Sequence, residues 1–403
     1  MKFTRTDFVK YLVILFSGIS VALFFWQSIR NFHYPNGNDL QSYINASKLF
    51  FNGENPFTGT LRRYIYPLFL AVAIYPLTLF KTVYVQKTIT AGLWSLLSYF
   101  AFFSTVFGCW NLIYDKRPFW YWFRQNLFPL ALIIILIHPF MQMEFINGQV
   151  NLITVALMAG FYFMLQKNQR FPAALLLAAA ASIKIAPGLC LILLLMTRQY
   201  RVFVYFFVLL LLFVFGLPYL INTQSIEYYR YFLNEVVPII TGNDIHNGFE
   251  NFSIISTLSY LFDVHWHPLA KISAICMLAV GLTVPIIVIA RKFYEGSNGF
   301  YRQTCLAAVI STLPLTFPMS ESHHLLTLLI PIITIVAYWQ KVLISGVGFL
   351  KDRLSFWFII CLAVLHTGQG LTPTPLRFFA LVGIYIGLLI LLKSKNNTFV
   401  AKI

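Results

Sequence analysis

Long apolar runs recur along the whole chain, and most of them are close to the length of a membrane-crossing helix. The first covers residues 11–29 and the last covers 376–392, and a helix needs about 20 apolar residues to cross a bilayer. Of the 403 residues, 59% are apolar or aromatic and 10% are charged. A soluble domain carries about 25% charged residues. The sequence therefore predicts an all-α, polytopic membrane protein and excludes a soluble enzyme or a disordered chain.

The apolar runs predict about twelve crossings in a single domain, residues 1–403, with outer loops and interfacial helices. Two segments need separate treatment. We expect residues 64–109 to make one net crossing, because two would place the basic loop KRPFWYWFR on the outer side. We expect residues 171–197 to form a hairpin of two half-length helices, because basic residues flank both ends and SIKIAPG breaks the middle.

The formal net charge of +16 would suggest a nucleic-acid partner in a soluble chain. Here the basic residues stand in short loops between apolar runs, where they orient a membrane protein. We therefore expect membrane lipids around the protein and no nucleic acid. The same residues predict cytoplasmic N- and C-termini in the cell (inner) membrane, with two long outer segments, 31–63 and 221–268.

Several motifs that would supply a metal or a nucleotide are missing from the sequence. No two acidic residues stand two positions apart, so there is no D-x-D pair to hold a metal and a sugar diphosphate. There is no G-x-x-x-x-G-K-[ST] phosphate loop, and the five cysteines lack metal-ligand spacing. We expect neither metal nor cofactor, and we infer that the driving force arrives in the substrate, as in a lipid-linked donor.

The first outer segment carries the most information. Asp39 follows the turn PNGN and begins the amphipathic stretch DLQSYINASKLFF, as expected of a helix that lies in the membrane interface. We expect Asp39 to be the N-cap of this helix. Spacing alone leaves two interpretations open, a cap with no further role and a carboxylate that takes part in chemistry.

Several motifs, taken in order, resemble glycosyltransferase family 87. They are an aspartate after the first apolar run, Y-x-x-A-x-x-L-F-x-G-x-N-P-F from Tyr43, Y-P-L from Tyr66, NGQVNL from Asn147, ASIKIAPGL from Ala181 and SESHH from Ser320. Better-known members are polyprenyl-phosphate-mannose-dependent alpha-1,2-mannosyltransferases of the GT-C fold. The resemblance therefore implies a GT-C membrane enzyme and a polyprenyl-phosphate-sugar donor. The family usually has two prolines after the tyrosine, where this chain has Tyr66, Pro67 and Leu68.

The resemblance implies that Asp39 is the catalytic base. The donor already carries a good leaving group, so one carboxylate and nearby cations are sufficient. Lys184 is the leading candidate for a cation that binds the donor phosphate. A lysine in an apolar segment costs roughly 2.5 kcal/mol or more, so its ammonium must meet an anion, a carboxylate or water. Alternatively, its side chain extends to the outer surface. The other expected phosphate ligands are Arg62, Arg63, His323 and His324, which would otherwise contact lipid headgroups or cap a helix. The expected sugar and acceptor ligands are Tyr66, Gln149, Asn151, Asn251 and Ser253, with helix capping as the alternative for Asn151.

These observations together predict an inverting transferase that moves a hexose, mannose-like, to a glycolipid or polysaccharide acceptor on the outer face of the cytoplasmic membrane. Two other classes stay open. A transporter or flippase would use Lys184 and the broken helices as a midplane binding site. A lipid-linked oligosaccharide ligase would centre on histidine and arginine in a late loop.

Overall fold

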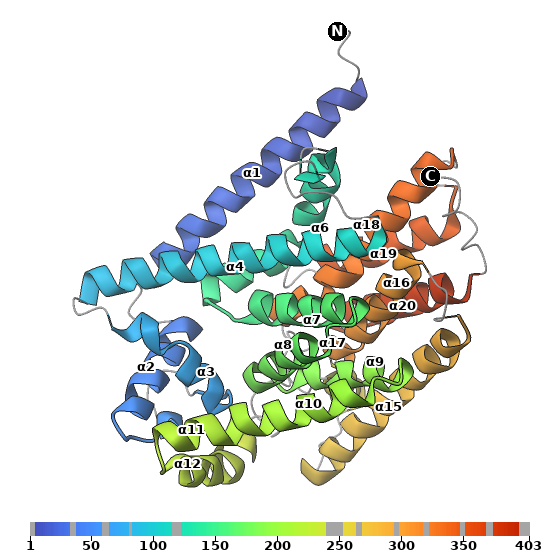
Figure 1. Cartoon of the computed structure of the whole chain (residues 1–403). Helices are drawn as coiled ribbons and strands as arrows, with labels where there is room; N and C mark the ends of the chain where they lie inside the picture. The colour runs from blue at the N-terminus through green and yellow to red at the C-terminus, as the bar shows by residue number, and fades with distance from the viewer. Residues whose placement is uncertain are drawn as a thin grey trace.

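The computed structural model describes residues 5–32, 38–58, 64–79, 83–114, 122–123, 125–238, 253–262, 268–293, 298–316, 322–346, 351–367 and 374–394. These residues form α-helices, short 3-10 helices and two π-helical turns, with no β-strand among them. The elements follow one another as α1 (Arg5–Phe32), α2 (Asp39–Phe51), η1 (Pro56–Thr58), α3 (Leu68–Ala73), η2 (Tyr75–Thr78), α4 (Val83–Ile113), α6 (Leu127–Asn147), α7 (Asn151–Gln166), α8 (Arg170–Ile183), η3 (Ala186–Cys190), α9 (Leu191–Met196), α10 (Tyr200–Leu211), η4 (Leu212–Gly216), α11 (Leu217–Ile221), α12 (Ser225–Tyr231), η5 (Phe232–Val236), α14 (Ile254–Phe262), α15 (Pro268–Phe293), α16 (Gly299–Ser311), α17 (Leu313–Thr316), η6 (Ser322–Leu328), α18 (Leu329–Ile344), α19 (Arg353–His366) and α20 (Thr374–Lys393) (Figure 1). The all-α class predicted from the sequence is confirmed.

Seven helices in the described part of the chain are long and apolar enough to cross a membrane. They are Lys10–Phe32, Lys87–Ile113, Leu127–Asn147, Tyr200–Ile221, Ser273–Arg291, His324–Ile344 and Leu376–Lys393. Four further apolar helices, Asn151–Gln166, Arg170–Ile183, Ala186–Met196 and Arg353–His366, are shorter. The polytopic architecture is therefore confirmed, whereas the expected count of about twelve crossings is not, because several apolar runs fold into helices shorter than a full crossing.

The two segments that complicated the count consist of helices of different lengths. The described part of the first run, residues 64–79, contains only the six-residue α3 and the four-residue η2, and the 31-residue α4 is long enough to cross alone. In the 171–197 segment, α8 ends at Ile183, and η3 and α9 follow. The rings of Phe171, at the start of α8, and Tyr205, in α10, lie 6.2 Å apart. The segment therefore returns to the end of the molecule where it began, as a hairpin does.

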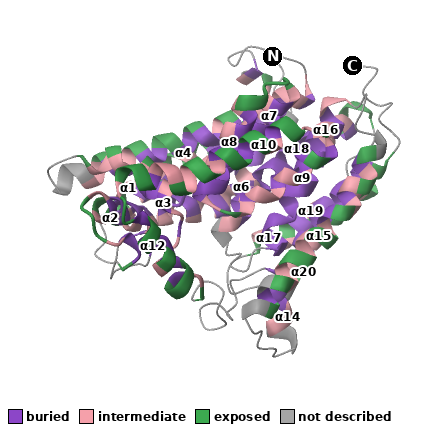
Figure 2. Ribbon diagram, turned by 60° about the horizontal axis from the view of Figure 1, so that its bottom comes forward, coloured by how far each residue is buried: buried purple, intermediate pink, exposed green. Residues whose placement is uncertain are grey.

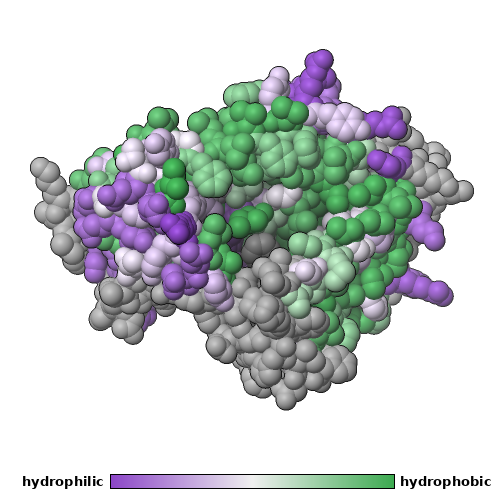
Figure 3. All heavy atoms as spheres, turned by 90° about the horizontal axis from the view of Figure 1, so that it is seen from below, coloured by the Kyte–Doolittle hydropathy of each residue, from purple (hydrophilic) through white to green (hydrophobic). Residues whose placement is uncertain are grey.

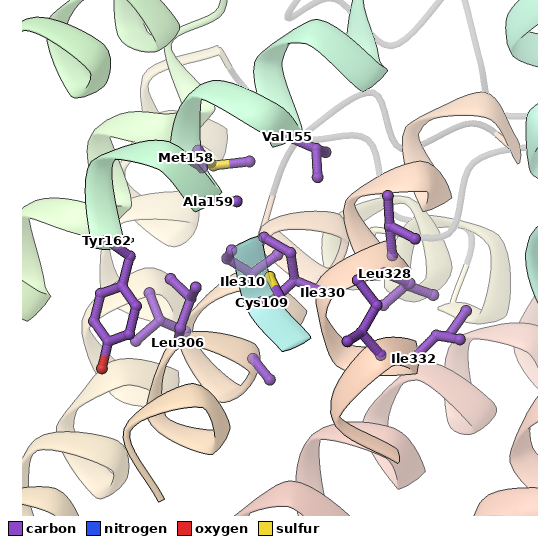
Figure 4. Packing of buried hydrophobic residues seen from close by; sticks show 14 of the residues in the cluster. Cys109, Val155, Met158, Ala159, Tyr162, Leu306, Ile310, Leu328, Ile330 and Ile332 are labelled. Carbon is purple, nitrogen blue, oxygen red and sulfur yellow. The ribbon is translucent and has the colours of Figure 1, made fainter. Parts of the chain in front are cut away.

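The core lies where α4, α6, α7, α16 and α18 pack together. Tyr162 and Met158 of α7 face Leu306 and Ile310 of α16 across this core (Figure 4). In the span His324–Ile344, 67% of the most apolar stretch is buried inside the molecule. The buried share is 17% in each of the spans Lys10–Phe32, Tyr200–Ile221 and Ser273–Arg291. The last three helices carry exposed apolar side chains on the periphery (Figure 2). Such surfaces match a lipid environment.

Hydrophilic residues gather at two ends of the molecule. Figure 3 shows an apolar middle region, with hydrophilic residues at the left end, where α2 and α12 lie in Figure 1, and at the right edge. At the left end, Asn222, which follows the span Tyr200–Ile221, donates from Nδ2 to the carbonyl oxygen of Phe50 at 3.1 Å. The span Tyr200–Ile221 therefore starts at the beginning of α10 and ends beside α2. The start of α10 and helix α2 lie at opposite ends of this 22-residue span.

Candidate active site

Three chain segments meet at the polar end of the molecule: the start of α2, the turn between α6 and α7, and the break after α8. The turn depends on Gly148, which ends α6 in the left-handed conformation with φ +62°. A Cβ at this position would lie 2.7 Å from Cβ of Leu40 and 3.1 Å from Nδ2 of Asn38. Glycine therefore provides both the backbone conformation and the close approach of α2.

Asp39 is the first residue of α2 rather than its cap. The preceding residue, Asn38, is the N-cap, and its side-chain oxygen accepts from the backbone N–H of Gln41 at 3.2 Å. The expectation that Asp39 caps this helix is therefore wrong. The partly buried carboxylate of Asp39 instead accepts a hydrogen bond from Nε2 of Gln149, which is 110 residues away in sequence.

Gln149 is buried, with 3% of its surface exposed, and it is held from several sides. Its Oε1 lies 3.3 Å from the hydroxyl of Tyr43 and 3.2 Å from the hydroxyl of Tyr66. Its backbone oxygen accepts from Nε1 of Trp94 at 3.1 Å. Because Oε1 faces the phenols, Nε2 faces Asp39. The side-chain amide of Gln149 therefore orients the Asp39 carboxylate.

Tyr43 is a buried phenol in the centre of this arrangement. Burial raises its pKa well above the usual value, and the nearby Tyr66 and Asp39 raise it further. The hydroxyl therefore stays protonated and able to donate a hydrogen bond. Its ring lies 5.1 Å from that of Tyr66 in an edge-on arrangement, a geometry that favours aromatic packing.

Lys184 terminates α8, where the backbone turns extended at φ −136° and ψ 138°. Its Nζ donates to Oδ1 of Asn151 at 2.5 Å and lies 5.4 Å from the ring centroid of Tyr66. The ammonium is only partly buried and occupies the tip of the hairpin. An amide oxygen and an aromatic face both stabilise a cation there.

Glu144 belongs to the same cluster, although the sequence did not single it out as a site residue. It is 1% exposed, and its two carboxyl oxygens accept from the backbone N–H of Leu152 at 2.9 Å and from Nδ2 of Asn151 at 2.8 Å. One sequence signal could have identified it, because Glu144 is the lone acidic residue in the apolar run before NGQVNL. Glu144 holds the start of α7 through the N–H of Leu152, while Val150, the N-cap of α7, makes no side-chain capping bond.

The structure thus brings together five of the residues expected from the sequence and leaves the others outside the cluster or undescribed. These five residues are Asp39, Tyr66, Gln149, Asn151 and Lys184. Together with Tyr43 and Glu144, we call them the Asp39 cluster. Arg62, Arg63, Asn251 and the side chain of His323 lie outside the described residues. Ser253 accepts from the N–H of Ser256 at 3.2 Å and so caps α14. His324 lies in η6, which packs against α6 and α7.

Comparisons with known proteins identify the family. The sequence profile of Glycosyltransferase family 87 matches residues 64–318, a range that includes most of the Asp39 cluster but begins after Asp39. The crystal structure of ArnT from Cupriavidus metallidurans bound to undecaprenyl phosphate is similar to this chain with a TM-score of 0.46 and 12% identity, over 98% of this chain and 78% of that one. No curated protein sequence matches the chain. Because the profile covers more than half of the residues and confirms the resemblance of the sequence motifs, the chain belongs to glycosyltransferase family 87.

Proposed function

We propose that the protein is an inverting hexosyltransferase that takes a mannose-like sugar from a polyprenyl-phosphate donor. The acceptor is a glycolipid or polysaccharide on the outer face of the cytoplasmic membrane. The observation that carries this proposal is the proximity of an oriented carboxylate, Asp39, and a cation, Lys184, at a polar end of the molecule. Asp39 is hydrogen-bonded to Gln149, which contacts Tyr66, and the Lys184 ammonium lies over the ring of the same tyrosine. Family membership supports glycosyl transfer, and the acyclic lipid bound to ArnT, undecaprenyl phosphate, is the leaving group of such a donor.

The proposed reaction needs one proton acceptor and one stabilised leaving group. Asp39 takes the proton from the acceptor hydroxyl as its oxygen bonds to the anomeric carbon. The bond between that carbon and the phosphate oxygen breaks, and polyprenyl phosphate leaves with the electron pair. Lys184 stabilises the charge that develops on the phosphate, with Arg62, Arg63, His323 and His324 as further proposed ligands. Attack opposite the phosphate inverts the anomeric centre, so a beta-linked donor gives an alpha-linked product.

The distribution of charge supports placing the Asp39 cluster on the outer side. Four basic residues stand in the two turns that flank the hairpin or at the helix starts that follow them: Lys167, Arg170, Arg198 and Arg201. These turns lie at the end of the molecule opposite α2. Short basic turns of this kind stay in the cytoplasm. The other end carries both signs of charge, including Glu227 and Arg230 of α12 at 4.0 Å. We infer that α2 and the Asp39 cluster face outward and that donor and acceptor bind there.

The replacement Asp39→Asn tests the proposed base. The amide keeps the size of the side chain but does not accept a proton at neutral pH, so transfer from labelled polyprenyl-phosphate mannose should fall about 100-fold or more. Donor binding and melting temperature should stay close to those of the wild type. The matched control is Glu54→Gln, which removes an exposed carboxylate from the same segment and should leave the rate unchanged.

A residual rate above about one tenth of wild type in Asp39→Asn would reject Asp39 as the base, because the loss would be smaller than general-base removal produces. The same preparation distinguishes the other two classes. A transporter or flippase would move labelled lipid across a vesicle membrane without forming a new glycosidic bond. A ligase would transfer an oligosaccharide from its lipid carrier and would not depend on Asp39.

A further inference from the structure

Glu144 is a buried carboxyl group to which the proposed reaction assigns no step. Its Oε1 accepts from the backbone N–H of Leu152, and its Oε2 accepts from the side-chain amide of Asn151. Both carboxyl oxygens of Glu144 therefore act as acceptors here, whereas an asparagine amide has one accepting end and one donating end. Glu144 therefore fixes the orientation of Asn151, with Nδ2 turned toward α6.

The fixed orientation of Asn151 determines what Lys184 meets. With Nδ2 engaged by Glu144 at 2.8 Å, Oδ1 points toward the ammonium of Lys184 at 2.5 Å. An ammonium only donates hydrogen bonds and has three hydrogens. Asn151 thus stands between an accepting carboxyl oxygen of Glu144 and the donating ammonium of Lys184, and one orientation of its amide satisfies both. The reversed orientation would place two donors against each other at Lys184.

We propose that Glu144 is a positioning residue that acts through Asn151 to aim the Lys184 ammonium at the phosphate of the lipid-linked donor. This inference rests on the proposed function, which makes Lys184 a phosphate ligand. It assigns to Glu144 a role beyond holding the start of α7. A residue with only that structural role would affect stability and leave phosphate affinity unchanged in the folded protein.

The single variant Glu144→Gln tests the proposal directly. The introduced side chain has one acceptor, which the Leu152 N–H takes, and it therefore presents an N–H to Asn151. The amide of Asn151 then turns over and presents its own N–H to Lys184. We expect the affinity for undecaprenyl phosphate in detergent micelles to fall about tenfold, because the ammonium loses the acceptor that aims it. The Michaelis constant for the donor should rise more than kcat falls.

The double variant Glu144→Gln, Asn151→Asp provides the rescue. The carboxylate now at position 151 accepts from the introduced glutamine amide on one side and from Lys184 on the other, so each donor again faces an acceptor. We expect undecaprenyl phosphate affinity to return to within about threefold of wild type, since the hydrogen-bond pattern at the ammonium is restored. The control, Glu54→Gln, removes an exposed carboxylate and should not change affinity.

The measurements separate this inference from the proposed function. Melting temperature and undecaprenyl phosphate affinity are measured on the same purified proteins. Unchanged affinity in Glu144→Gln, or a double variant that regains melting temperature but not affinity, would overturn the positioning role, as would a wild-type protein that binds no undecaprenyl phosphate. A wild-type protein that binds this lipid but transfers no sugar would overturn the proposed function alone, and the affinity series would still decide the role of Glu144.

Discussion

At the scale of single residues, Lys184 has surroundings that suit a ligand-binding cation. An ammonium at the centre of a membrane helix costs about 2.5–3.5 kcal/mol, but Lys184 lies at the end of α8, where the backbone is extended. The oxygen of Asn151 and the ring of Tyr66 stabilise its charge. These contacts hold the ammonium within the Asp39 cluster.

We predict that Lys184→Gln weakens undecaprenyl phosphate binding about tenfold or more, because a charged hydrogen bond of about 1.5–3 kcal/mol is lost. Lys184→Arg should recover part of the affinity, since the charge is kept in a different geometry. Binding and melting temperature are compared in the same samples, with the exposed Lys48→Gln on α2 as control. Normal binding in Lys184→Gln, together with a lower melting temperature, would assign Lys184 a structural role only.

At the scale of secondary-structure elements, the docking of α2 on the α6–α7 turn places the carboxylate. One face of α2 is buried, with Leu40, Tyr43, Ile44, Ser47 and Phe50 on it. This is the apolar face that the sequence predicts for an interfacial helix. The contact between Leu40 and Gly148 sets how closely the helix approaches Gln149.

Gly148→Ala should therefore disturb the site more than an alanine at another positive-φ glycine. The added Cβ meets Cβ of Leu40 at 2.7 Å, and overpacking of this kind costs about 1–3 kcal/mol. The matched control is Gly53→Ala, where φ is +80° and no atom lies within 4 Å of the added Cβ. We expect Gly148→Ala to show both a lower melting temperature and a lower transfer rate than Gly53→Ala. Equal losses in the two variants would show that backbone conformation alone matters at Gly148.

At the scale of the whole molecule, the mechanism requires the Asp39 cluster to face the compartment that holds the acceptor. Asn52 and Arg198 are exposed residues near opposite ends of the molecule. They therefore report the orientation of the protein in the membrane.

We predict that a cysteine at position 52 reacts with an impermeant maleimide in intact cells, and that one at position 198 reacts only after permeabilisation. The charge rule places the basic turns inside. Native Cys276 is exposed and is replaced by serine in both variants, whereas the other four cysteines are buried. The reverse labelling pattern would place the cluster in the cytoplasm and contradict the outer-face proposal.

The sequence by itself determined the class of the protein and the residue types at its site. Apolar length and low charge required membrane helices, and the polar break SIKIAPG predicted an interruption of the 171–197 segment, where α8 ends at Ile183. These are local properties, which periodicity and composition record. The expected count of about twelve crossings is not confirmed in the described residues, because hydropathy measures apolar length and does not show where a helix ends.

Only the tertiary structure decided which side chains meet. The hydrogen bond between Gln149 and Asp39 joins residues 110 positions apart, and the one between Lys184 and Asn151 joins residues 33 apart. No local pattern encodes such pairs, because they depend on how α2, α7 and α8 pack. The same packing places Gln149 against Asp39, whereas Asn38 caps α2 through a local hydrogen bond from the N–H of Gln41. It also brought the buried Glu144 to Asn151, since a carboxyl group removed from water must find hydrogen-bond donors within the fold.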